Sequence, residues 1–186
     1  PNNLMRFIGS LMLINFSKTL KVIMILVVTT FCQACAVTIN PHNFTINNQA
    51  SPHLSQLTQG SITIKSQPIE KSGRAIPVAG GSITVNENEF TKVLLGKLKS
   101  TLNISDTVTT GESKILTIQV SRVSIQPDIM MNCVIDYNRK LGNGVFFGFQ
   151  TRSRNWNYET ACENALTQAA NEILHNRDTV KYFEGE

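Results

Sequence analysis

Acidic residues are absent from the first 35 positions of the chain. The charged side chains there are Arg6, Lys18 and Lys21, so most of the net charge of +4 comes from this leader. All 13 acidic residues lie beyond Cys35 with the remaining basic ones, which leaves that part of the chain almost neutral. A nucleic-acid-binding domain needs a sustained basic surface. The charge distribution therefore argues against a nucleic-acid partner.

Residues that perform catalysis or bind metals are also scarce. The histidines are His42, His53 and His175, and no H-x-x-x-H pair or Cys/His cluster accompanies them. A metal site needs ligands that converge at fixed spacing. The sequence has no G-x-S-x-G element, and its Gly-Asn-Gly stretch at 142–144 lacks the helix and the Lys-Ser/Thr pair of a phosphate loop. We therefore expect no metal, no other cofactor and no catalytic residues.

A secretory signal is present at the start of the chain. Lys18 and Lys21 precede an apolar run at 22–31, which is too short to span a bilayer as a stable helix. A positive start, a short apolar core and a small residue before the cut are the parts of a cleaved signal. We expect residues 1–34 to be this signal, with Met12 as the true start because it gives a leader of ordinary length.

The end of the leader, Ala34-Cys35, resembles the lipobox of bacterial lipoproteins. The resemblance covers the leader alone, and it departs from the family pattern at Cys32 and Gln33. It implies that the signal is cut before Cys35, that the Cys35 thiol carries diacylglycerol and that the new amine is acylated. Ala36 stands where an Asp would retain the protein at the inner membrane, which favours the outer membrane. The alternative is an ordinary cleaved signal followed by a chance cysteine.

Beyond Cys35 the chain divides into two parts. Residues 36–60 are rich in Asn, Gln, Ser, Thr, Pro and His, and their isolated apolar residues have no sustained period. Such a segment buries too little apolar area to offset its ordering entropy. We therefore expect 35–60 to be the lipidated N-terminus and a flexible tether, with an edge strand near Phe44. We expect 61–186 to be a single periplasmic domain.

Regular patterns begin at residue 61. Alternating apolar residues predict strands, 3.6-residue spacing predicts helices, and Gly or Pro clusters predict loops. The order predicts an α+β domain of two layers, with a mainly antiparallel sheet of four to five strands and two helices on one face. The expected strands are 61–65, 82–85, 114–125, 129–139, 145–152 and 179–183, the expected helices begin at Asn86 or Asn88 and at Asn157, and the expected loops are 66–81 and 140–144.

Cys133 and Cys162 are the two cysteines of this domain. An even pair in an oxidising compartment favours a disulfide. Strand alternation places Cys133 with Met131 and Ile135, and helical spacing places Cys162 on an apolar stripe, so both should face the helix–sheet interface. The alternative is a pair of buried thiols. No C-x-x-C spacing supports a redox-active pair.

The main candidate for an interaction surface is the stretch from Arg152 to Tyr158. It gathers Arg152, Arg154, Trp156 and Tyr158 where a strand leads into a helix. Trp, Tyr and Arg are enriched at interface hot spots. We consider these four residues a possible partner-binding patch. The alternative is that Trp156 covers the edge of the core while the arginines are simply solvated.

Three classes of function remain open. The favoured one is a lipid-anchored, non-enzymatic envelope component that binds a protein partner in outer-membrane maintenance, transport or assembly. The second is a binder of a small apolar or glycan ligand in a helix–sheet cavity, and the third is an envelope hydrolase. A pocket above about 300 Å³ with convergent polar groups would favour the second or third class. A filled interior with an exposed aromatic and arginine patch would favour the first.

Overall fold

A computed structural model of the chain describes residues 35–45, 62–78, 81–102, 104 and 114–185. By its internal contacts the chain divides into two units, residues 1–36 and 37–186. The expected signal and the cleavage site before Cys35 lie outside the described residues or at their border. The fold described below belongs to the second unit.

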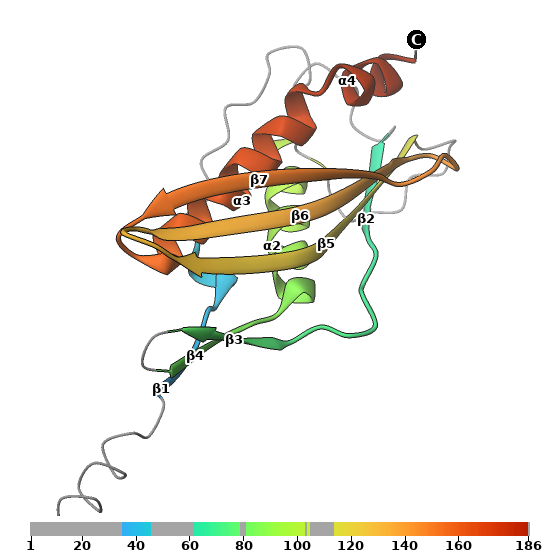
Figure 1. The fold of residues 1–186 in the computed structure, drawn as a ribbon. Coiled ribbons are helices and arrows are strands. Elements are labelled where there is room, and N and C mark those ends of the chain that lie inside the picture. The colour runs from blue at the N-terminus through green and yellow to red at the C-terminus, as the bar shows by residue number, and fades with distance from the viewer. Residues whose placement is uncertain (1–34, 46–61, 79–80, 103, 105–113, 186) are drawn as a thin grey trace, which may run out of the picture. The chain divides into compact units, whose positions relative to one another are not determined.

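Within the described residues the fold has two sheets and three α-helices, and their arrangement can be followed in Figure 1. The smaller sheet has the strand order β1-β4-β3 and the larger one β2-β5-β6-β7. In the larger sheet β5–β6 and β6–β7 are antiparallel, whereas β2–β5 is parallel. The predicted α+β class is therefore confirmed. The elements are β1 (Cys35–Thr38), the 3-10 turn η1 (Pro41–Asn43), β2 (Ile62–Ser66), β3 (Arg74–Val78), β4 (Gly81–Val85), α2 (Glu87–Thr101), β5 (Lys114–Pro127), β6 (Met131–Leu141), β7 (Phe147–Asn155), α3 (Tyr158–His175) and α4 (Arg177–Glu184).

The helices α2 and α3 cover one face of the larger sheet (Figure 1). Asn86 begins α2 by accepting hydrogen bonds from the Asn88 and Glu89 backbone N–H groups, and Asn157 begins α3 by accepting one from the Glu159 backbone N–H. The core between helices and sheet is closed, because the apolar stripes of both helices meet the inward side chains of the strands. Its members include Phe90, Leu94, Leu98, Leu116, Ile118, Val120, Ile135, Tyr137, Ala161, Ala165, Leu166 and Ala169.

Two segments differ from the expected secondary structure. Within the predicted loop 66–81, β3 pairs with β4, with Ile76 opposite Ile83. Pro77 is tolerated because β3 is an edge strand, where a missing N–H breaks no ladder. The predicted strand at 179–183 is instead part of α4. Thr179 and Phe183 are both buried there. A spacing of four residues fits both the alternation of a strand and about one turn of a helix, so the pattern of so short a segment does not distinguish the two.

The segment from Val37 to Thr45 packs on the domain, which differs from the expected tether. Ile39 is 2% exposed and donates its backbone N–H to the Thr84 carbonyl at 3.0 Å. The ring of Phe44 meets Phe90 edge-on, with centroids 5.8 Å apart. Few apolar residues occur in this segment, but Ile39 and Phe44 both pack against the core. The expected edge strand near Phe44 is absent, since this residue follows η1, and the rest of the expected tether lies outside the described residues.

No helix in the described part of the chain is long and apolar enough to cross a membrane.

Candidate functional site

A disulfide joins Cys133 on β6 to Cys162 on α3, with Cα atoms 5.0 Å apart. Both residues are buried in the helix–sheet interface, as the strand and helix spacings predicted. The bridge lies near the start of α3, close to where β7 ends. It therefore fixes the junction that bears the predicted interaction patch.

Strand β7 holds Arg152 and Arg154 on the solvent side of the sheet. Thr151 points toward the helices and donates its hydroxyl to the Ala165 carbonyl of α3 at 2.9 Å. Its neighbours along the strand therefore point to the opposite face. Trp156, just past the strand, is 74% exposed and makes no ring contact with another described residue. Three of the four predicted patch residues are thus exposed.

Tyr158 is placed differently from the other three. It is the first residue of α3 and packs, half-buried, against the hydrophobic core. The change from a two-residue to a 3.6-residue period at Asn157 turns its side chain away from the outer surface. The structure therefore brings Arg152, Arg154 and Trp156 to the exterior and assigns Tyr158 to the core edge.

The outer sheet face continues from β7 across β6 to β5. The strand register places Arg152 opposite Val134 and Gln150 opposite Asp136, and Asp136 in turn opposite Arg122. The Gln150 side chain donates to the Asp136 carboxylate at 2.7 Å. Two further amide pairs, Asn138–Gln119 and Asn132–Gln126, lie along β6 and β5. We use "outer sheet face" for Arg122, Asp136, Gln150, Arg152, Arg154 and these amides.

The charge on the outer sheet face is unbalanced. Arg122, Arg152 and Arg154 are exposed, and none forms an ion pair or side-chain hydrogen bond with another residue that the structure describes. The face has one carboxylate among the strand residues, that of Asp136, and it accepts a hydrogen bond from Gln150. Such a surface offers guanidinium groups and amide donors to an acidic or hydrogen-bonding partner.

A second polar cluster is buried at the far end of the sheet. Arg139 is 2% exposed, donates to the Thr179 hydroxyl and lies over the Phe149 ring. Tyr137 donates to the Glu172 carboxylate at 2.8 Å. Burial raises the pKa of Tyr137 and lowers the pKa of Arg139. Because these groups bond to α3 and α4, the cluster fastens the helices to the sheet.

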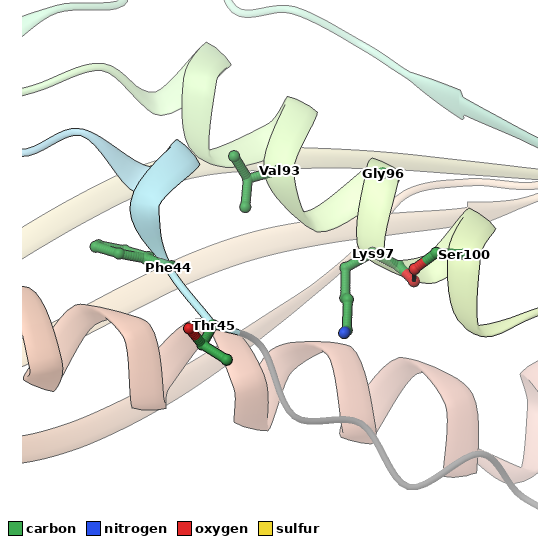
Figure 2. A pocket seen from close by; sticks show the side chains of 6 residues that line it. All are labelled: Phe44, Thr45, Val93, Gly96, Lys97 and Ser100. Carbon is green, nitrogen blue, oxygen red and sulfur yellow. Dashed lines mark hydrogen bonds between the residues drawn. The ribbon is translucent and has the colours of Figure 1, made fainter.

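A hollow of about 400 Å³ lies between α2 and residues 44–45 (Figure 2). Its apolar lining is Phe44 and Val93, and Thr45, Lys97 and Ser100 supply polar groups. Gly96 faces open space, since a Cβ atom added there would meet no atom within 4 Å. The ligand-binding class predicted a cavity between helices and sheet. The hollow is instead bounded by α2 and the segment at 44–45, with no residue of the sheet in its lining, and half of its lining residues are exposed.

The histidines do not converge. The imidazole of His42 bonds to Glu89 at 2.7 Å, His175 bonds to the Asn171 carbonyl, and His53 lies outside the described residues. Among the residues that the structure describes, no three His, Cys, Asp or Glu side chains are placed to hold a metal ion.

Comparison with known proteins finds a similar fold among solved structures. No family model and no curated protein matches the chain. The fold is similar to the crystal structure of protein XCC0632 from Xanthomonas campestris, which has the family model DUF330. The TM-score is 0.54 at 15% identity, over 82% of this chain and 98% of that one. At this identity the similarity concerns the fold alone.

Proposed function

We propose that this protein is a lipid-anchored envelope component that binds a protein partner through Arg152, Arg154, Trp156 and the adjoining outer sheet face. The anchor would be Cys35, which follows a positively charged and apolar leader and precedes Ala36. The location would be the periplasmic face of the outer membrane. The role would be in outer-membrane maintenance, transport or assembly.

The observation that supports partner binding most strongly is the exposure of Trp156. An indole ring left 74% exposed forgoes the free energy of burying a large apolar surface. Two arginines without partners in the described structure lie on the strand that leads to it. Aromatic and arginine side chains are the residues that contribute most to protein–protein affinity.

The packing of the core favours this proposal over a ligand carrier. The inward side chains of α2, α3 and β5–β7 are buried and in contact, so they fill the interface in which an apolar ligand would have been held. The hollow beside α2 exceeds the size of about 300 Å³ that a ligand site needs, but half of its lining residues are exposed, so it encloses a small ligand less than a helix–sheet cavity would. The outer sheet face instead bears three exposed arginines, and the exposed Trp156 directly follows β7 at its border.

Mass spectrometry of the mature protein tests the anchor. We expect Cys35 to be the first residue and to have added acyl mass. A mature terminus at a later residue without lipid would refute the anchored part of the proposal.

Site-specific photocrosslinking in intact cells tests the surface. A photoreactive residue in place of Trp156 should capture a defined protein, whereas the same group in place of Ser100, at the hollow, should not. Capture at Ser100 and none at Trp156 would support the ligand-site alternative and contradict the proposed surface.

A further inference from the structure

The outer edge of β7 has no strand beside it in the described structure. β7 is the last strand of the order β2-β5-β6-β7 and pairs with β6 along one side, from Arg139–Phe147 to Met131–Asn155. No backbone group on its other side bonds to a residue that the structure describes. Such an edge presents a row of N–H and C=O groups that can pair with an added strand.

The other described edge strands are protected by means that β7 lacks. β3 has five residues and contains Pro77, which has no N–H to donate. β1 has four residues and β2 has five. β7 has nine residues, contains no proline and shows no register shift against β6. Proteins usually shorten, bulge or interrupt an open edge of this length.

β7 is also held rigidly, which lowers the entropy cost of adding a strand. The Thr151 hydroxyl is bonded to the Ala165 carbonyl of α3. Next to it, the disulfide ties β6 to the same helix. The edge is therefore ordered before any partner arrives.

The charges along β7 select the kind of strand that it can accept. Arg152 and Arg154 are two residues apart and therefore lie on the same face of the sheet, and Arg122 lies on that face two strands away. A second copy of β7 would bring two more arginines to that face, and like charges on neighbouring strands repel. A segment with carboxylates at every second position would place them beside these arginines.

We propose that β7 binds an extended acidic segment of a partner protein, which adds to the sheet as a fifth strand. Backbone hydrogen bonds to the edge of β7 supply the pairing, and carboxylates on alternate residues meet Arg152 and Arg154. Trp156 lies at the end of this edge and covers the end of the added strand. The inference rests on the proposed function for the origin of the segment.

The test uses the purified full chain and a capped nine-residue peptide of alternating glutamate and threonine, with a lysine and threonine peptide as the charge control. Trp156 is the one tryptophan in the sequence, so its emission reports on this edge alone. We expect the glutamate peptide to shift that emission to shorter wavelength and to slow amide hydrogen exchange at alternate residues of β7. No effect of the glutamate peptide, or equal effects of both peptides, would overturn the proposal.

The role of backbone pairing is tested by N-methylating the glutamate peptide at every second nitrogen, in each of the two possible frames. An added strand points alternate N–H groups toward β7, so one frame should abolish binding and the other should preserve it. Equal binding in both frames would mean that the peptide is held by side chains alone, and would overturn edge addition.

The role of charge is tested with Arg152→Gln and Arg154→Gln combined. Loss of two exposed ion pairs should weaken peptide binding about tenfold at low salt. The matched control, Lys65→Gln with Lys71→Gln, removes the same charge at the opposite edge and the following loop, and should change binding less than about twofold. If the two double variants weakened peptide binding equally, the assignment of the binding site to β7 would be contradicted.

Failure of this inference differs from failure of the proposed function. A protein captured at position 156 in cells, together with no peptide addition to β7, would retain the function and reject the edge mechanism. Protection of β7 amides without peptide, with a concentration-dependent dimer in sedimentation, would show that a second copy occupies the edge and would reject the acidic segment.

Discussion

The two faces of the larger sheet differ in their side chains and in what covers them. The inner face is apolar, covered by α2 and α3 and joined to α3 by a disulfide. The outer face bears amides and arginines, and side-chain amides of neighbouring strands are joined there by hydrogen bonds to one another and to Asp136. Stability therefore resides in the inner face, while the outer face is left available for recognition. This division predicts that substitutions on the two faces have effects of different kinds.

The largest difference should come from truncating one side chain on each side of the sheet. Phe90 on α2 is fully buried, so Phe90→Ala should lower the free energy of unfolding by about 3–5 kcal/mol. Gln119→Ala on the outer face should cost less than about 1 kcal/mol, since it removes one bond to Asn138. Denaturant unfolding followed by circular dichroism measures both. Similar losses for the two variants would contradict the division between the faces.

The disulfide should contribute nearly as much as a large core side chain. It closes a loop with a sequence separation of 29, which the chain-entropy model values at roughly 3–4 kcal/mol. Cys133→Ser and Cys162→Ser should each lower the melting temperature, and the double variant should cost little more than either alone. Labelling of the unreduced, unfolded chain should find neither thiol reactive. Additive losses in the double variant would argue against a bond between the two.

Trp156 should contribute to binding with little effect on folding. Because the ring is exposed, Trp156→Ala should change the free energy of unfolding by less than about 0.5 kcal/mol. In the unaltered protein, tryptophan emission should already resemble that of a solvated indole and should shift little during unfolding. A blue-shifted emission in the folded protein without partner would show that Trp156 is covered.

The smallest effect concerns the contact between η1 and α2. Hydrogen bonds from Lys92 and then from His42 hold the pKa of Glu89 below its ordinary value of 4.5. A carboxyl group with a lowered pKa in the folded state adds stability above its unfolded pKa, and this is lost as pH falls through the folded value. Acid should therefore loosen residues 40–43 slightly before the core unfolds.

Glu89→Gln should reduce the acid dependence of this segment, measured by amide exchange below pH 5. The matched control is Glu70→Gln, which alters an exposed carboxylate that makes no ion pair or hydrogen bond with another described residue. An equal change in both variants would assign the effect to net charge.

Much of the inner face could be predicted from periodicity. The strands around 114–125 and 129–139 and the helix that Asn157 begins follow from local patterns, and so does the inward orientation of Cys133 and Cys162. α4 and the packing of Ile39 could not be predicted, because each depends on a partner distant in sequence. β3 pairs with its neighbour β4, but the prolines and glycines of 66–81 indicated a loop there. Pro77 is compatible with a strand only at a sheet edge, and Ile39 is buried in the core beside β4, to whose Thr84 carbonyl it donates its backbone N–H.

The candidate site was predicted along β7, whereas Arg122, which lies across the sheet, was missed. Two-residue alternation places Arg152 with Arg154, but Arg122 joins them through a register shift between Val120 and Arg122. Strict alternation from Ile118 and Val120 would have turned Arg122 inward. The spacing of three between the buried Val120 and Val123 is the signal of this shift, and it is visible in the sequence.

The bond between Ile39 and Thr84 has a consequence for how the protein would meet a partner. Ile39 lies four positions after Cys35, so the chain between them extends at most about 14 Å. With lipid on Cys35, as proposed, the domain would stay close to the bilayer surface and would not diffuse freely through the periplasm. A partner held at the same membrane would then meet the protein by diffusion in two dimensions, where a modest intrinsic affinity acts at a high effective concentration.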